Sequence, residues 1–138
     1  MPTSTTRSEI TVVRDFLGAL ERLDIDAAAD LLAPDVVYQN VPFPAARGKA
    51  AVERQLRWLA RYGSGFEVSY DNVAAEGPVV LTERTDVLVF GRLKAAFWVC
   101  GTFEVHDGRI TLWRDRFDMV DFAMAFVRGG LKILVGSR

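Results

Sequence analysis

The chain has 138 residues, of which 50% are hydrophobic and 25% are charged. This length allows one domain with a substantial core and is too short for two ordinary ones, so we expect a single domain over residues 1–138. The formal net charge is −1 and the charges are interspersed, which argues against a nucleic-acid partner. The sequence contains no apolar stretch of membrane-spanning length, which argues against a membrane protein.

The first half of the chain is patterned mainly for helices. Apolar residues recur at helical spacing from Ile10 to Leu20 and predict an amphipathic helix over about residues 8–22. A short helix through residues 27–32 follows, with Asp24 or Asp26 as its cap. A strand over residues 36–40 then precedes a third helix, which runs from Gly48 to near residue 63.

The second half changes to strand periodicity. Strands are predicted at residues 66–70, 79–90, 94–105 and 109–117, and a helix at 119 to about 130. Helices followed by hairpin-linked strands indicate the α+β class. We expect a strongly curved, mixed and mainly antiparallel β-sheet that forms a cone around an apolar pocket, with the N-terminal helices packed on its concave side and a C-terminal helix.

Three charged residues interrupt strands that are otherwise apolar. Because side chains alternate along a strand, Arg84 and Asp86 project to the same side, and Asp115 on the last strand shares a face with two aromatic residues. Two interpretations of this group are equally good from the pattern alone. It is an active site, or it is a structural ion network that fixes strand register or a dimer contact.

Tyr38 and Asn40 add polar groups on a neighbouring strand. Alone, a tyrosine and an asparagine before a proline-rich loop are more often packing and turn residues. Together with Arg84, Asp86 and Asp115 they could face one cavity, where Tyr38, Asn40 and Asp115 would hold a water molecule as a nucleophile.

Other familiar chemistries lack their residues. His106 is the sole histidine and has no serine or cysteine nucleophile plausibly beside it, and no cluster has the spacing of zinc ligands. The sequence also lacks a glycine-rich phosphate loop, so we expect neither a metal nor a cofactor. Cys100 has no cysteine partner for a disulfide in the chain. Residues 1–6 are polar and lack the apolar core of a signal peptide, which favours a cytoplasmic location.

Three runs of sequence carry a resemblance to a known family: VYQN at 37–40, LTERTDVL at 81–88 and WRD at 113–115. In this order they resemble the limonene-1,2-epoxide hydrolase family of the nuclear-transport-factor-2-like (NTF2-like, or SnoaL-like) superfamily. The resemblance implies a cofactor-independent epoxide hydrolase that adds water to a small hydrophobic epoxide and produces a vicinal diol. It also implies a homodimer, with the outer face of the sheet as the interface.

The resemblance also implies a role for each polar residue. Asp115 is the general base that takes a proton from water, Tyr38 and Asn40 position that water, Asp86 is the general acid, and Arg84 orients both aspartates. A push-pull mechanism of this kind needs the proton on Asp86 while Asp115 is ionised, and no covalent intermediate.

Apolar residues at the spacing of the predicted elements are candidate walls of the substrate pocket, although such residues are more often plain core. The candidates are Leu17, Leu20, Leu59, Phe66, Leu88, Phe97, Val99, Phe117 and Phe122. Two other functions remain possible within the same fold. One is a ketosteroid-isomerase-like or polyketide-cyclase-like enzyme. The other is a non-catalytic protein that binds a small molecule.

Overall fold

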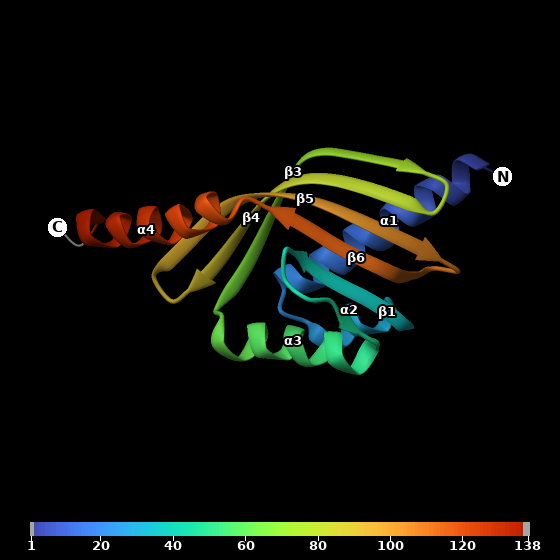
Figure 1. Cartoon of the computed structure of the whole chain (residues 1–138), viewed down its shortest axis with the longest axis horizontal. Coiled ribbons are helices and arrows are strands. Elements are labelled where there is room, and N and C mark those ends of the chain that lie inside the picture. Colours follow the sequence, from blue (N-terminus) through green and yellow to red (C-terminus); the bar gives the residue numbers. More distant parts are fainter. Residues whose placement is uncertain (1, 137–138) are drawn as a thin grey trace.

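Three helices and two strands of one sheet occupy the first half of the molecule, and four long strands and a last helix follow (Figure 1). The computed structural model describes the backbone of residues 2–136 and the side chains of residues 9–136. The helices are α1 (Pro2–Glu21), α2 (Ile25–Asp30), α3 (Lys49–Tyr62) and α4 (Met119–Gly136). The strands are β1 (Leu32–Val41), β2 (Ala46–Arg47), β3 (Gly65–Glu76), β4 (Val79–Phe90), β5 (Leu93–His106) and β6 (Arg109–Phe117).

The sheet is mixed, with the strand order β2-β1-β6-β5-β4-β3. Strands β3 to β6 form an antiparallel meander, and β1 joins its edge by pairing parallel to β6. This parallel pairing sets Tyr38 opposite Trp113 and Asn40 opposite Asp115. The α+β class and the mainly antiparallel mixed sheet confirm the prediction from the sequence. The parallel pairing brings together residues that are far apart in the chain.

Several element boundaries differ from the predicted ones. Helix α1 begins at Pro2, α4 continues to Gly136, and the short strand β2 had no signal in the sequence. Strand β1 begins at Leu32 and includes Pro34, which lies where the pairing with β6 shifts register, and a proline without an N–H is tolerated at such an irregularity. Strand β3 extends through polar residues 71–76 because a bulge after Tyr70 keeps this segment paired with β4.

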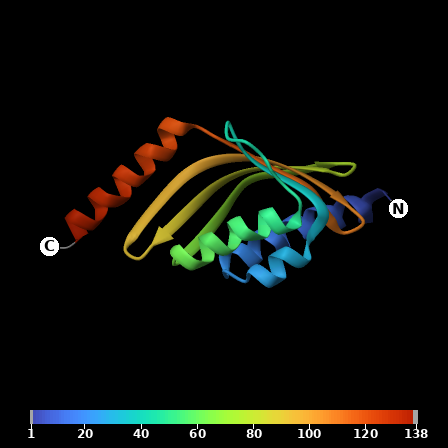
Figure 2. The same ribbon diagram turned by 60° about the horizontal axis from the view of Figure 1, so that its bottom comes forward.

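Helices α1, α2 and α3 lie together on one face of the sheet, as Figure 2 shows. Asp24 caps α2 by accepting a hydrogen bond from the backbone N–H of Ala27 at 3.1 Å. Phe16 of α1 is fully buried against Trp113 of β6, with an edge-on contact at 4.9 Å between ring centroids. The apolar faces of these helices and the inner face of the sheet therefore form one core.

Helix α4 covers part of a sheet edge. Strand β6 ends opposite Val99, so the preceding residues of β5 have no strand on that side. There the backbone N–H of Trp98 donates to Asp121 at 3.1 Å, and Arg128 donates to the carbonyl of Ala96 at 3.4 Å. These contacts satisfy backbone groups that an open edge would expose. No helix within residues 2–136 is both long enough and apolar enough to cross a membrane.

Candidate active site

The three charged residues in the strands are buried together on the inner face of the sheet. Arg84 is 0% exposed, Asp86 is 3% exposed and Asp115 is 6% exposed. Burial of charge without compensation costs several kcal/mol per ion, so each group needs a partner. The structure brings Asp86, two residues along β4, and Asp115, on β6, to the same guanidinium.

Arg84 donates five hydrogen bonds with its Nε, Nη1 and Nη2 atoms. Two bind Asp86 side by side, from Nε to Oδ1 at 3.0 Å and from Nη2 to Oδ2 at 2.8 Å. Two longer ones reach Asp115, from Nη1 to Oδ1 at 3.4 Å and from Nη2 to Oδ2 at 3.2 Å. The fifth runs from Nη1 to the hydroxyl of Thr82 at 3.0 Å. Arg84 thus couples the two carboxyls and pairs more closely with Asp86.

Tyr38 and Asn40 stand beside Asp115. The side-chain amide of Asn40 donates to the phenol oxygen of Tyr38 at 2.7 Å, and the ring of Tyr38 stacks on Trp113 at a centroid distance of 3.8 Å. A phenol that accepts one hydrogen bond still donates its own proton. Tyr38 can therefore donate to a water molecule while Asn40 and Trp113 hold its ring in place.

Burial sets the protonation of these groups. Burial raises the pKa of Asp115 above its ordinary value, and the nearby charge of Asp86 adds to this rise while Arg84 opposes it. Burial would lower the pKa of Arg84, but Asp115 and Asp86 outweigh it and raise that pKa, so the guanidinium stays charged. Burial, followed by the charge of Asp115, raises the pKa of Tyr38, which keeps the phenol neutral and able to donate.

The two carboxyls lie at unequal distances from Arg84. Its bonds to Asp86 are 3.0 and 2.8 Å long, and its bonds to Asp115 are 3.4 and 3.2 Å long. The expected mechanism places the shared proton on Asp86 and leaves Asp115 ionised, and that placement stays a prediction. The unequal distance of the two carboxylates from one guanidinium is a feature that the sequence does not reveal.

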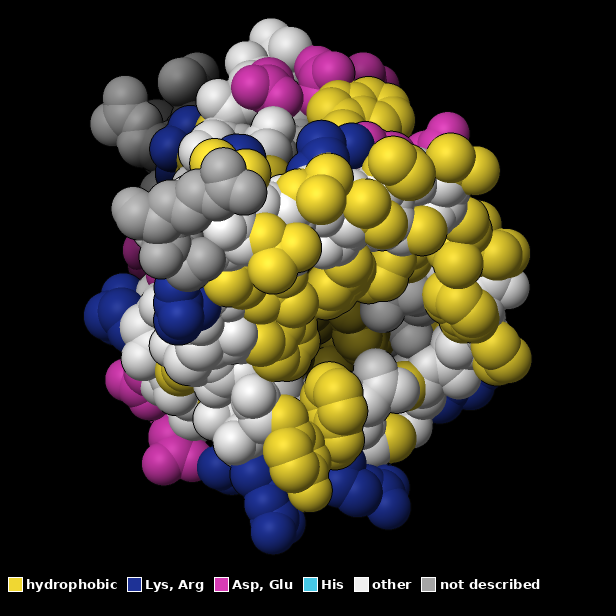
Figure 3. Space-filling model, turned by 90° about the vertical axis from the view of Figure 1, so that its left-hand side faces the viewer, with side chains coloured by type: hydrophobic (Ala, Val, Ile, Leu, Met, Phe, Trp, Pro, Cys, Tyr) yellow, Lys and Arg dark blue, Asp and Glu magenta, His cyan; other side chains and the backbone are white. Residues whose placement is uncertain are grey.

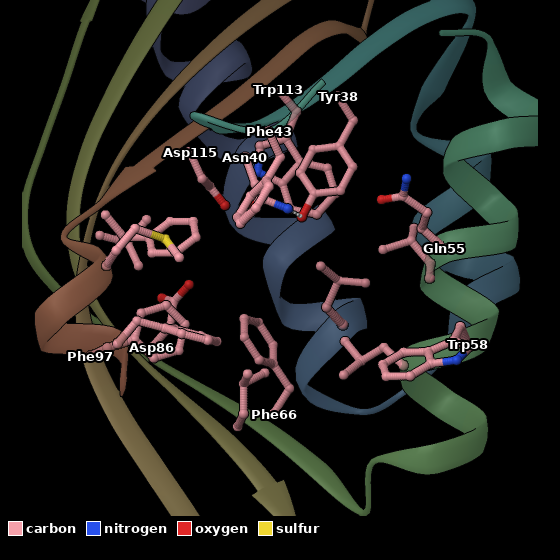
Figure 4. A pocket seen from close by; sticks show the side chains of 18 residues that line it. Tyr38, Asn40, Phe43, Gln55, Trp58, Phe66, Asp86, Phe97, Trp113 and Asp115 are labelled. Atoms are coloured by element: carbon pink, nitrogen blue, oxygen red, sulfur yellow. Dashed lines mark hydrogen bonds between the residues drawn. The ribbon is translucent and has the colours of Figure 1, made fainter. Parts of the chain in front are cut away.

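A cavity of about 460 Å³ opens over these groups. Asp86, Asp115, Tyr38 and Asn40 line it, with both carboxyl groups on one side and α3 opposite, as Figure 4 shows. Arg84 lies beneath the lining, between the carboxylates. This volume is in the range of small-molecule sites, and apolar side chains form most of the remaining wall.

Eight of the nine predicted wall residues line the cavity, namely Leu20, Leu59, Phe66, Leu88, Phe97, Val99, Phe117 and Phe122. Leu17 does not, because it faces the core and is fully buried there. Six lining residues were missed: Phe43, Gln55, Leu56, Trp58, Trp113 and Met119. Helical spacing from Leu59 could have indicated Gln55 and Leu56 on α3, and alternation from Asp115 could have indicated Trp113.

The mouth of the cavity is apolar. The side chains of Phe43, Trp58 and Met119 line the cavity and are nevertheless 49%, 59% and 44% exposed. Figure 3 shows one end of the molecule, where hydrophobic side chains frame a hollow. An aromatic cluster of Phe97, Phe117 and Phe122 closes another part of the wall, with ring centroids 4.9–5.9 Å apart. Access to the charged groups therefore passes over apolar surface.

Among residues 9–136, no group of three or more His, Cys, Asp or Glu side chains is arranged to hold a metal ion. The polar groups at the cavity are two carboxyl groups, a phenol and two amides, with a guanidinium beneath them.

Residues 7–128 match the family described as the limonene-1,2-epoxide hydrolase catalytic domain. The chain belongs to the limonene-1,2-epoxide hydrolase family. It is 46% identical over 125 residues to epoxide hydrolase EphG of Mycobacterium tuberculosis (strain ATCC 25618 / H37Rv), an alignment that covers 91% of this chain and 83% of that protein.

Solved structures agree with the assignment to the limonene-1,2-epoxide hydrolase family. The chain is similar to an LEH-like epoxide hydrolase of M. tuberculosis, with a TM-score of 0.90 and 45% identity over 95% of this chain and 98% of that one. An NTF2-like protein of unknown function from Burkholderia pseudomallei superposes with a TM-score of 0.75 at 17% identity, covering 86% and 97% of the two chains. This second likeness shows the NTF2-like fold alone.

Proposed function

We propose that this epoxide hydrolase of the limonene-1,2-epoxide hydrolase family works in one step, with Asp115 as general base and Asp86 as general acid. The observation that carries the proposal is the contact of Arg84 with both buried carboxylates at one side of an apolar cavity. A positioned acid and a positioned base each contribute typically about 10²- to 10⁴-fold to a rate.

The neighbours of Asp115 support its assignment as the base. A nucleophilic water needs acceptors for its protons, and Asp115 and the amide oxygen of Asn40 are adjacent on paired strands. Tyr38 donates to the same water. One lone pair of the water then attacks an epoxide carbon, its proton passes to Asp115, and the C–O bond breaks. Asp86 gives its proton to the departing oxygen, so the product is a vicinal diol.

The pair must then return one proton from Asp115 to Asp86. Because Arg84 contacts both carboxyls, the two groups titrate as one system that holds a single shared proton at catalytic pH. In the ligand-free protein burial raises the pKa of Asp115, although the mechanism needs this group ionised. We propose that a water bound at Tyr38 and Asn40, together with an epoxide oxygen near Asp86, shifts the proton to Asp86.

The apolar wall supports a small hydrophobic epoxide as the substrate, and the substrate and water are the only partners that the reaction needs. We propose that the eight predicted wall residues, all at the cavity surface, contact it. We also propose that the sheet curves strongly enough to form a cone around the cavity. Figure 2 supports this, since its long strands bend over the helices on one face.

The main alternative is an isomerase or cyclase that removes a proton beside a carbonyl group. Such a reaction needs a base and a donor to the developing oxyanion, and it has no evident need for an arginine between two aspartates. A non-catalytic binder needs neither carboxyl group inside an apolar cavity, where their burial destabilises the fold.

Carboxamide variants test the proposal. We expect Asp86→Asn and Asp115→Asn each to lose at least about 10²-fold in kcat, because each keeps the side-chain shape and removes the acid or base. Asp71→Asn, at an exposed position on β3, is the matched control. In H₂¹⁸O the wild-type protein should form a diol with one labelled oxygen. Near wild-type turnover by both site variants, in properly folded protein, refutes the mechanism.

We further propose a homodimer that associates through the outer face of the sheet. Leu81 and Trp98 support this interface, because both are large hydrophobic residues on that face and are 52% and 45% exposed. Sedimentation velocity at micromolar concentration should show a dimer, and Leu81→Lys should weaken it. A wild-type monomer under these conditions contradicts the proposal. We also propose a cytoplasmic location, which the free Cys100 supports.

A further inference from the structure

Arg84 and Asp115 meet although their strands are not neighbours. Strand β5 lies between β4 and β6, and its register places Gly101 between Thr82 on one side and Asp115 on the other. Strands two positions apart in a sheet are separated by about 10 Å. The Arg84 side chain therefore reaches Asp115 by crossing over the backbone of β5, on the face that lines the core.

The Arg84 side chain crosses β5 at Gly101, which has no side chain. A Cβ atom built on Gly101 would lie 2.5 Å from Nη1 of Arg84, 2.7 Å from Oδ1 of Asp115 and 2.8 Å from the hydroxyl of Thr82. Four glycines, at 48, 77, 91 and 108, need their freedom of backbone conformation because φ is positive there, and Gly101 is not among them. The absence of a side chain at Gly101, and not its backbone conformation, is therefore what leaves room for Arg84 to reach Asp115.

Thr82 on β4 also holds the guanidinium of Arg84 in place. Its hydroxyl accepts from Nη1 of Arg84 at 3.0 Å and lies 3.4 Å from the carbonyl of Gly101, to which it donates. Thr82 itself is 3% exposed. The ring of Phe103, two residues further along β5, lies 6.0 Å from Cζ of Arg84. The guanidinium is therefore enclosed by Thr82, Phe103 and the two aspartates.

We propose that Gly101 and Thr82 are positioning residues of the active site, which act by setting where Arg84 stands between Asp86 and Asp115. Because Gly101 has no side chain, the guanidinium can extend over β5 to Asp115. The hydroxyl of Thr82 holds Nη1 beside that carboxylate. The position of Arg84 decides how strongly each carboxylate is stabilised, and so which of them carries the shared proton. The catalytic consequence rests on the proposed function, whereas the placement of Arg84 does not.

Gly101→Ala tests the first half of the proposal. Because nonbonded heavy atoms approach to about 3.5 Å, the new methyl group displaces Nη1 or the Asp115 carboxylate by about 1 Å. A shift of this size at a catalytic group costs about 10²-fold in kcat. It also weakens the attraction between Arg84 and Asp115, so the pKa of Asp115 rises and the acidic limb of the kcat/KM profile moves to higher pH. Asp86 and Tyr38 also face Asp115, and Gly101→Ala substitutes neither of them.

Two measurements separate this proposal from the proposed function. The first is the pH profile of diol formation in wild type, Gly101→Ala and the control Gly130→Ala, whose added methyl meets nothing within 4 Å. The second is a ¹³C NMR titration of the carboxyl carbons of Asp86 and Asp115, which needs no activity. We expect the apparent pKa assigned to Asp115 to rise in Gly101→Ala and to stay unchanged in Gly130→Ala. An unchanged titration in folded Gly101→Ala overturns the proposal even if the wild type is an epoxide hydrolase.

Thr82 variants test the second half, and they serve if Gly101→Ala does not fold. Thr82→Ser keeps the acceptor for Nη1, and Thr82→Val replaces it with a methyl group of similar volume. We expect Thr82→Val to lose roughly tenfold in kcat relative to Thr82→Ser, since a buried N–H of Arg84 is left unpaired. A crystal structure should show Arg84 moved in the valine variant. Equal kcat values, or an unmoved Arg84, overturn this half.

Discussion

Replacing Arg84 with methionine should show how far the fold depends on the guanidinium between the two aspartates. Methionine has a similar length and no charge, so Arg84→Met leaves Asp86 and Asp115 buried at 3% and 6% exposure without a counterion. Removal of one partner from a buried ion pair costs about 3–5 kcal/mol. For a chain of this size that corresponds to a decrease of roughly 10–20 °C in Tm.

The loss should depend on pH. Without Arg84, which opposes the rise, burial and the charge of Asp86 raise the folded-state pKa of Asp115 further above its unfolded value of about 4. The stability of Arg84→Met is therefore fully present below that unfolded pKa and is lost as the pH rises through the folded-state pKa. The stability difference between wild type and variant should accordingly be small near pH 4 and largest above pH 7.

Chemical denaturation followed by circular dichroism, at fixed protein concentration, measures this difference at pH 4 and pH 8. Arg57→Met is the matched control, because Arg57 pairs with Asp26 and Glu53 on the surface, where ion pairs contribute little to the free energy of unfolding. Adding Asp86→Asn and Asp115→Asn to Arg84→Met should restore stability at pH 8 but not activity. If Arg84→Met alone keeps wild-type stability at pH 8, the reasoning about buried charge is refuted.

Three further results follow from the same structure. Burial raises the folded-state pKa of Asp115, so the wild type loses stability as the pH rises from the unfolded pKa through the folded one. Asp115→Asn lacks this loss, and its stability relative to wild type, measured by urea titration, should therefore increase with pH. A stability difference that stays constant with pH contradicts this. Phe16→Ala, at a fully buried position against Trp113, should destabilise by about 3–5 kcal/mol, and a loss below 1 kcal/mol would show that the core rearranges. Tyr38→Phe keeps the stack on Trp113 but loses the hydroxyl that Asn40 binds, so kcat should fall roughly tenfold while Tm changes little; wild-type kcat excludes a role for the phenol.

Sequence patterns predicted the local features of this protein well. Alternation correctly put Arg84 and Asp86 on one face of β4, and Asp115 with Trp113 on one face of β6, because a strand admits only two faces. The boundaries of β4 and β6 agree with the predicted strands at 79–90 and 109–117, since turn residues lie on both sides of β4 and directly before β6. The resemblance to the limonene-1,2-epoxide hydrolase family added what alternation left open, namely a catalytic interpretation of the charges.

Features that depend on pairing between distant segments were not available from these patterns. Leu17 and Leu20 are both buried in the core through α1, yet only Leu20 also lines the cavity. Strand β2 and the polar end of β3 have weak strand patterns and are strands because neighbouring backbones pair with them. Tertiary context overrides local propensity at such places.

The sequence by itself determined the α+β class, the elements that carry the charged residues and the family to which the chain belongs, because these depend on local periodicity and residue type. Only the tertiary structure decided how those residues are arranged. It placed β5 between Arg84 and Asp115, with Gly101 at the crossing, and it set Arg84 closer to Asp86 than to Asp115. The electrostatic balance between the two carboxyls follows from those distances, and a distance across three strands is a property of the folded sheet.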